Sequence, residues 1–215
     1  MPYTSGRMVF PEVCVVLRSP IRSVLCMIVL LPAGCAPRIT RLQLQEIDPS
    51  GHSGDFFQDF GECFYSLRPG GDLSIVLRFE APATVDPRQT IRQVVHLRCF
   101  WQPRPGVTDA EESMINGSVC YVMQTGVTAI SYEGGMFVSF KIDRRKKRIT
   151  GKLESSELKP LRRRAGAQGP FGTLFAKGTF VGVEHPRRVT AILNEMERHL
   201  GVRPVYTPRR TPFVR

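Results

Sequence analysis

Histidines next to carboxylates are the residues in this sequence whose spacing could support acid–base or metal chemistry. The sequence has four histidines, His52, His96, His185 and His199. His52 stands near Asp55 and Asp59 in a loop rich in glycine and serine, but a solvated loop histidine is the simpler interpretation. The chain has no His-Glu-x-x-His, Cys-x-x-Cys, Gly-x-Ser-x-Gly or phosphate-binding glycine loop. We therefore predict no catalytic residues, no metal site and no cofactor.

The N-terminal region has the pattern of an export signal. Arg18 and Arg22 precede an apolar run, residues 24–31, and the run ends in Pro32-Ala33-Gly34-Cys35. A cationic stretch, about 7–15 apolar residues and an exit of small residues form a secretory signal. The run is too short to cross a bilayer as a helix, which takes about 20 residues, and no later stretch is long enough. We therefore predict a cleaved signal and no membrane span.

The segment Ala33-Gly34-Cys35 resembles the lipobox of bacterial lipoproteins. The leucine that this family prefers stands one position further out, at Leu31, because Pro32 intervenes. The resemblance covers only this segment. It implies that the Cys35 thiol receives a diacylglyceryl group and that cleavage just before it makes Cys35 the first residue. Two or more acyl chains, at about 0.8 kcal/mol per buried CH₂, then hold a protein stably on a membrane.

The resemblance for the N-terminal segment and the residue pattern of the body together predict the organisation of the chain. Residues 1–34 are the signal peptide, 35–38 the lipidated cysteine and tether, 39–201 a β-rich domain with a C-terminal helix, and 202–215 a basic, proline-rich tail. The location is then the envelope of a bacterium, on the outer side of the cytoplasmic or outer membrane. Two alternatives stay open: ordinary secretion, and burial of the apolar run inside a cytosolic protein.

Three cysteines remain in the body once the signal is removed and Cys35 is acylated: Cys63, Cys99 and Cys120. An exported protein meets an oxidising compartment, so one disulfide can form. Cys99 and Cys120 lie in strand-like runs joined by a loop, and we predict that pair. Free buried thiols are the equal alternative.

Positive charge is concentrated in one part of the sequence. The chain carries a net charge of +11, and residues 144–164 alone hold 10 basic and 2 acidic residues. The basic residues form two runs, Arg144, Arg145, Lys146, Lys147 and Arg148, and Arg162, Arg163 and Arg164. Solvated turns explain such runs, but the two could also form an anion-binding patch for lipid headgroups or an acidic envelope polymer. Nucleic acid is disfavoured because no aromatic residues that could stack on bases interleave with these runs.

Alternating apolar residues predict a mostly β fold. The strands are expected at residues 39–47, 73–79, 90–101, 118–124, 128–132, 136–142, 149–154 and 171–183. The clearest hairpin places Val138, Phe140 and Ile142 opposite the 149–153 arm. Phenylalanines in 55–67 fit a helix face better than a strand, although Gly61 weakens a helix and we leave the segment ambiguous. Residues 158–170 read as a loop.

In the C-terminal part the spacing of apolar residues changes from that of a strand to that of a helix. Val189, Ile192, Leu193, Met196 and Leu200 fall at helical spacing, which predicts a helix over 187–200 that buries this stripe against the sheet. The fold class is therefore an antiparallel β-sandwich or open barrel with a C-terminal α-helix. The function we favour is a binding or structural domain anchored in the envelope. An exported hydrolase-like enzyme with a dispersed site and a basic nucleic-acid-binding protein are the alternatives.

Overall fold

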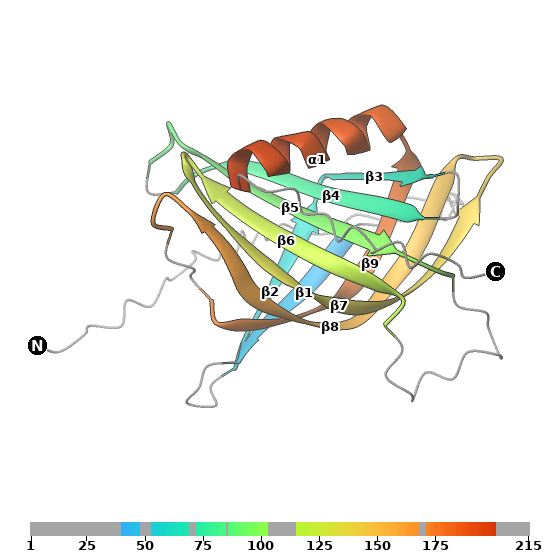
Figure 1. Ribbon diagram of the computed structural model, residues 1–215, viewed down its shortest axis with the longest axis horizontal. Helices are drawn as coiled ribbons and strands as arrows, with labels where there is room; N and C mark the ends of the chain where they lie inside the picture. The colour runs from blue at the N-terminus through green and yellow to red at the C-terminus, as the bar shows by residue number, and fades with distance from the viewer. Residues whose placement is uncertain are drawn as a thin grey trace, which may run out of the picture. The chain divides into compact units, whose positions relative to one another are not determined.

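A computed structural model describes residues 40–47, 53–68, 72–84, 86–102, 115–167 and 171–200. This part of the chain forms nine strands and one helix (Figure 1). They are β1 (Thr40–Ile47), β2 (Ser53–Phe60), β3 (Glu62–Leu67), β4 (Leu73–Pro82), β5 (Thr90–Cys99), β6 (Gly117–Thr125), β7 (Thr128–Asp143), β8 (Arg148–Arg164), β9 (Thr173–Glu184) and α1 (Pro186–Leu200). The chain divides into two units, Met1–Cys35 and Ala36–Arg215, and every described residue belongs to the second.

The strands form one sheet that closes into a barrel. Consecutive strands from β3 to β9 are antiparallel neighbours, and the end of β9 closes the ring by a short parallel pairing with β3. The rest of that edge of β9 pairs with β1, which pairs in turn with β2. Only Gly61 separates β2 from β3, so the β1–β2 hairpin runs directly into the ring. Closure of this kind leaves few unpaired strand edges.

Two apolar layers hold the unit together. Inward-facing side chains fill the barrel, and Ile75, Leu97, Ile149 and Leu153 are completely buried there. The second layer lies between α1 and the outer face of the strands that it crosses (Figure 1). In this layer the helix buries its apolar stripe against outward-facing residues of β4, β5, β6 and β7: Val189, Ile192, Met196 and Leu200 against Val76, Val94, Cys120, Val122 and Ala129.

Several expectations from the sequence are confirmed. The fold is mostly β with a C-terminal helix, and of the two architectures we considered the barrel describes it. The helix runs from Pro186 to Leu200 with its stripe buried. The expected hairpin forms with its expected partners, since Val138 pairs with Leu153 and Ile142 with Ile149. These segments have strong periodicity and a single buried face, which is why local pattern suffices to find them.

One segment left ambiguous is now assigned, and two local expectations are wrong. Residues 55–67, whose phenylalanines fitted a helix face better than a strand, form strands β2 and β3. Residues 128–132 and 136–142 are one strand, β7, because the chain continues extended through Gly134 and Gly135. The expected loop 158–170 is strand as far as Arg164, because Leu158 is buried in the barrel interior and β7 supplies its backbone partners.

Gly178 of β9 lies in close contact with β1 and beside a bulge in the ladder with β8. The backbone of Gly178 has φ +156°, and a Cβ there would lie 2.2 Å from the carbonyl oxygen of Arg41. The ladder between β8 and β9 shifts register immediately after the pair of Leu153 with Gly178. Only glycine allows β1 and β9 to approach so closely at this bulge.

The signal peptide predicted for residues 1–34 and the lipid attachment predicted at Cys35 lie outside the described residues, and so does the tail 202–215. Across the described residues, no helix combines the length and the apolar character that a membrane crossing needs.

Candidate functional site

The loop carboxylates near His52 do not form a reaction centre among the described residues. His52 itself lies outside them, while Asp55 and Asp59 stand exposed on β2. Arg41 Nη2 donates to Asp59 at 2.7 Å, and this guanidinium holds the pKa of Asp59 below its ordinary value. Gln43 donates to Asp55 at 3.3 Å. Within the described residues, no group of three or more side chains is arranged to hold a metal ion.

The expected disulfide between Cys99 and Cys120 is wrong. Cys99 pairs with Gly117 and faces the barrel interior, whereas Cys120 pairs with His96 and faces α1. Side chains on opposite faces of a sheet cannot bridge. Both thiols and that of Cys63 are free and buried, and burial raises the pKa of Cys63 and of Cys99 to about 12. They are therefore inert core residues, which is the alternative we left open.

The two basic runs predicted to form one anion-binding patch lie at opposite ends of the barrel. Arg144, Arg145, Lys146 and Lys147 form the β7–β8 turn, and Arg148 begins β8. Arg162, Arg163 and Arg164 finish the same strand, on the order of 45 Å further along it. They are therefore two separate sites. We call the end with the β7–β8 turn the basic end, and the end where β8 finishes the opposite end.

Two arginines at the opposite end have structural partners. Arg164 Nη1 donates to the backbone carbonyls of Arg198 at 2.5 Å and His199 at 3.0 Å, and so caps the last turn of α1. Arg162 Nε lies 3.7 Å from a carboxylate oxygen of Glu133. Both charges contribute to holding neighbouring elements, which agrees with a structural role.

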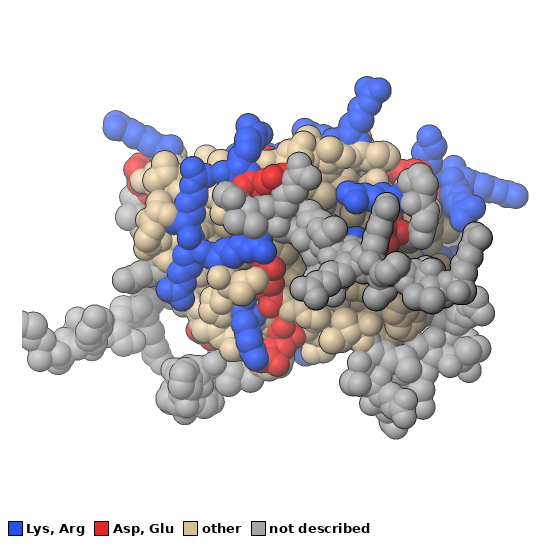
Figure 2. All heavy atoms as spheres, viewed as in Figure 1, with Lys and Arg blue, Asp and Glu red and all other residues tan. Residues whose placement is uncertain are grey.

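The residues 144–148 at the basic end have almost no partners within the protein. Residues 144–148 are all exposed, and Lys146 is the one of them within ion-pair distance of a described carboxylate, that of Asp143 at 4.0 Å. Arg144, Arg145, Lys147 and Arg148 form no ion pair with any residue that the structure describes. Asp143 instead accepts hydrogen bonds from the backbone N–H groups of Arg145 and Lys146 and so shapes the turn. Figure 2 shows basic side chains projecting from the end where Figure 1 places this turn.

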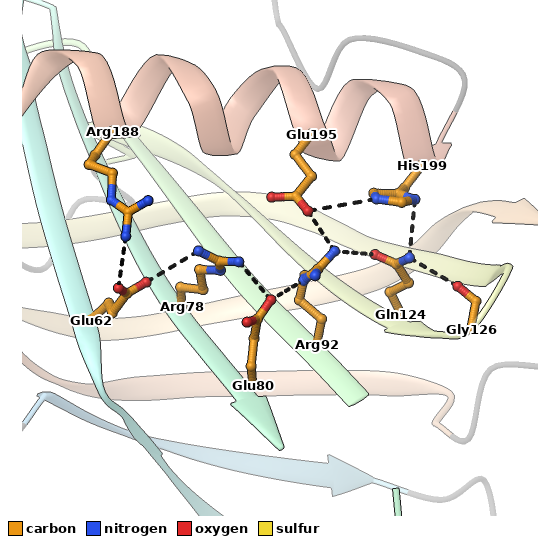
Figure 3. A network of polar contacts seen from close by, with 9 residues as sticks. All are labelled: Glu62, Arg78, Glu80, Arg92, Gln124, Gly126, Arg188, Glu195 and His199. Atoms are coloured by element: carbon orange, nitrogen blue, oxygen red, sulfur yellow. Dashed lines mark hydrogen bonds and ion pairs between the residues drawn. The ribbon is translucent and has the colours of Figure 1, made fainter. Parts of the chain in front are cut away.

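A large polar network connects α1 to the sheet (Figure 3). Arg92 on β5 is its centre, because its Nη1 donates to Glu195 of α1 at 2.6 Å and its Nε to Glu80 of β4. Arg78 also donates to Glu80, at 2.7 Å. The outer members extend the network along the helix: Glu62 with Arg78 and Arg188, and Gln124 with Arg92, His199 and the carbonyl of Gly126.

Charge in this network is balanced between three arginines and three glutamates. Burial acts to raise the pKa of Glu80, but hydrogen bonds from Arg92 and Arg78 outweigh it and the pKa lies below the ordinary value. Burial lowers the pKa of His199, which favours a neutral ring against Gln124. Ionised carboxylates held by guanidinium groups are poor general bases. We call this set of contacts the helix network. Because its ion pairs join residues of α1 to residues of the strands, it holds the helix on the barrel.

His96 is the one buried histidine of the described chain. It lies on β5, on the outward face that also carries Val94, and its Nε2 has no hydrogen-bond partner among the described residues. Burial lowers its pKa to about 4, with Arg98 and Arg68 adding to the effect. The ring is therefore neutral in the folded protein near pH 7 and contributes to the core.

An open depression of about 620 Å³ lies on the outer face of β7, β8 and β9, close to the basic end. Lys141, Lys152, Thr150 and Thr179 contribute its polar lining. Lys152 is paired with Glu154, which also accepts a hydrogen bond from Ser139. This pairing reduces the positive charge that the depression could offer an anion.

Known proteins give no guide to this arrangement, since no protein-family model, no curated protein and no solved structure matches the chain. The helix network was not foreseen from the sequence, because its members come from β3, β4, β5, β6 and α1. The sequence signal that does exist is the run of arginines and lysines in 144–148, and the structure shows that this run stands apart from the other basic run.

Proposed function

We propose that this chain is an exported bacterial lipoprotein whose barrel is a binding or structural domain of the cell envelope. The observation that carries the proposal is the N-terminal pattern: arginines, the apolar run 24–31, and Ala33-Gly34-Cys35. Acylation of Cys35 would hold the domain at a membrane surface without any spanning helix.

The start of the barrel supports this proposal. Four residues separate Cys35 from Thr40, the first residue of β1, and an extended chain spans at most about 3.6 Å per residue. An anchor at Cys35 would therefore keep the first strand within about 18 Å of the lipid. No long linker intervenes, so the barrel itself would meet the membrane surface.

The character of the helix network favours binding or structure over catalysis. Its three carboxylates are all engaged by arginines, and the three body thiols are buried. Neither set offers an available base or nucleophile.

Intact-mass measurement on the protein extracted from the membranes of its native cells tests the proposal. We expect a mature species that begins at Cys35 and carries the added mass of acyl chains, and a Cys35→Ser variant that is neither acylated nor cut at this position. A native protein that retains residues 1–34 in soluble form would overturn the proposal.

A further inference from the structure

We infer that the basic end of the barrel docks on an anionic lipid surface and that Trp101 enters the interface between headgroups and acyl chains. This inference deepens the function proposed above and rests on it for the membrane that the domain would meet. Its first three elements are independent of the N-terminal segment, because they come from the charge, the exposed apolar side chains and the hydrogen bonds of the barrel, and only the fourth depends on the anchor at Cys35.

The first element is positive charge without internal partners. Residues 141–148 contain six basic residues and one acidic residue, and all five basic residues of 144–148 are exposed. Most described arginines elsewhere on the sheet are paired, as Arg41 is with Asp59 and Arg98 with Asp72. The β7–β8 turn is therefore the place where the described barrel offers concentrated positive charge to an outside anion.

The second element is a set of apolar side chains exposed at this same end. Trp101 is 40% exposed, Leu67 at the end of β3 is 42% exposed, and Ile115 before β6 is 61% exposed. Tryptophan is enriched at membrane interfaces because its ring is apolar while its N–H can stay hydrated. The opposite end also exposes apolar residues, Val127 and Leu161, but there Arg162 and Arg164 are engaged within the protein.

The third element is the way Trp101 is held beside the basic hairpin. Asn116, completely buried, exchanges hydrogen bonds with the backbone of Val138 at 2.7 and 2.8 Å and donates to the Trp101 carbonyl at 3.4 Å. Gln102 donates to the carbonyl of Phe140 at 3.4 Å. Phe140 precedes Arg144 by four residues, or about 13 Å of strand. The indole and the basic turn can therefore meet one surface together.

The fourth element is the place where the barrel begins. Thr40 exchanges hydrogen bonds with the backbone of Val181, and two residues later Val183 pairs with Arg148. Strand β9 alone lies between β1 and β8 here, so Thr40 is two strand spacings of about 4.8 Å from β8. A chain tethered at Cys35 would therefore approach the membrane with its basic end.

Charge and aromatic exposure together decide between possible partners. Lys and Arg near an anionic leaflet bind without fixed geometry, which suits a flexible exposed turn. Single-stranded nucleic acid requires several stacking aromatic side chains along the basic track, whereas residues 141–148 contain none. A lipid surface is therefore the partner that the basic end fits.

The experiment uses the fluorescence of Trp101, the only tryptophan in the chain. The full chain with Cys35→Ser, which cannot be acylated, is titrated with vesicles of phosphatidylglycerol and phosphatidylcholine and, separately, with pure phosphatidylcholine. We expect the emission to shift to shorter wavelength with the anionic vesicles alone, and the shift to disappear at high salt. The readout is specific to the basic end, so vesicle binding through residues 24–31 alone would not produce it.

Two charge variants with the same loss of net charge sharpen this test. Replacing the turn, Arg144→Ser, Arg145→Ser, Lys146→Ser and Lys147→Ser together, is expected to weaken the anionic-vesicle affinity read from Trp101 by at least about 100-fold. The matched control removes four charges elsewhere, Arg88→Ser, Arg163→Ser, Lys177→Ser and Arg198→Ser, and is expected to keep most of the affinity. Trp101→Ala removes the fluorescent probe, so its binding is measured by co-sedimentation with the anionic vesicles. Its affinity for these vesicles is expected to fall by about tenfold.

Three results would overturn the inference: no shift with anionic vesicles, an equal shift with phosphatidylcholine alone, or a shift with a DNA oligonucleotide at lower concentration than with vesicles. The outcome is separable from that of the lipoprotein proposal. A chain that docks here but starts before Cys35 in its native cells refutes the anchor alone, and an acylated chain whose Trp101 does not shift refutes the docking alone.

Discussion

Two groups of arginines in this protein have opposite surroundings. In the helix network, Arg78, Arg92 and Arg188 each reach a glutamate, and the charges of the network balance. In the β7–β8 turn, Arg144 and Arg145 project into solvent with no carboxylate partner among the described residues. Residue type alone does not distinguish these groups, but their partners do.

The difference indicates which charges hold the fold and which are available to a partner. Paired and half-buried charges lose affinity for outside ions because the internal carboxylates already satisfy them. Unpaired and exposed charges contribute little to stability and keep their field for an anionic surface. Each prediction below changes one region and asks whether the other responds.

The largest effect is expected where α1 packs on the barrel. Ile192 is 2% exposed between the helix and the sheet, so Ile192→Ala should lower the free energy of unfolding by about 2–5 kcal/mol. Urea unfolding followed by circular dichroism measures this change. Thr190→Ala, on the exposed face of the same helix, is the control and should change it by less than about 0.5 kcal/mol. Equal losses in the two variants would mean that α1 is not held by its apolar stripe.

Acid should destabilise the protein through His96. The pKa of His96 is about 4 in the folded protein and near 6.5 in an unfolded chain, so the unfolded state binds more protons between these values. Stability therefore falls as the pH drops from 6.5 to 4, by about 3 kcal/mol from this residue. Unfolding measured at pH 7 and pH 4.5 for the parent and His96→Leu checks the effect. A variant that loses as much stability to acid as its parent would exclude His96 as the source.

A smaller effect is expected within the helix network. Glu195→Gln removes the carboxylate that Arg92 contacts at 2.6 Å, and should lower the free energy of unfolding by about 1–3 kcal/mol. Glu157→Gln breaks the exposed pair with Lys159 and should cost less than about 1 kcal/mol. Chemical denaturation of the two variants side by side measures both. A larger loss in Glu157→Gln would contradict the structural role given to the network.

The sequence predicts the parts of this fold in which one face is buried at a regular period. The helix 187–200 and the hairpin of Val138 with Leu153 are of this kind. Residues 55–67 stayed ambiguous because phenylalanines spaced at three and four residues imitate a helix, whereas hairpin pairing with β1 and β4 holds the segment extended. Residues 158–164 were wrongly expected to be a loop, since their strand partners lie about thirty residues earlier, on β7.

The candidate site could be predicted only in part. The basic run 144–148 is visible in the sequence, but its separation from Arg162–Arg164 requires knowing that β8 continues between them. The predicted disulfide between Cys99 and Cys120 was wrong for a related reason, because strand register decides which face of the sheet each cysteine occupies. Trp101 was expected to end the strand 90–101, yet β5 ends at Cys99 and the indole is partly exposed beyond it.

The most direct test measures stability and vesicle affinity together in two variants of the same full chain, both in the Cys35→Ser background. One carries Glu195→Gln and the other replaces Arg144, Arg145, Lys146 and Lys147 with serine. We predict that Glu195→Gln loses about 1–3 kcal/mol of unfolding free energy and keeps its affinity for anionic vesicles. The turn variant should lose that affinity and change in stability by less than about 0.5 kcal/mol. A turn variant that binds anionic vesicles as tightly as its parent would contradict the division of roles between the two groups of charges.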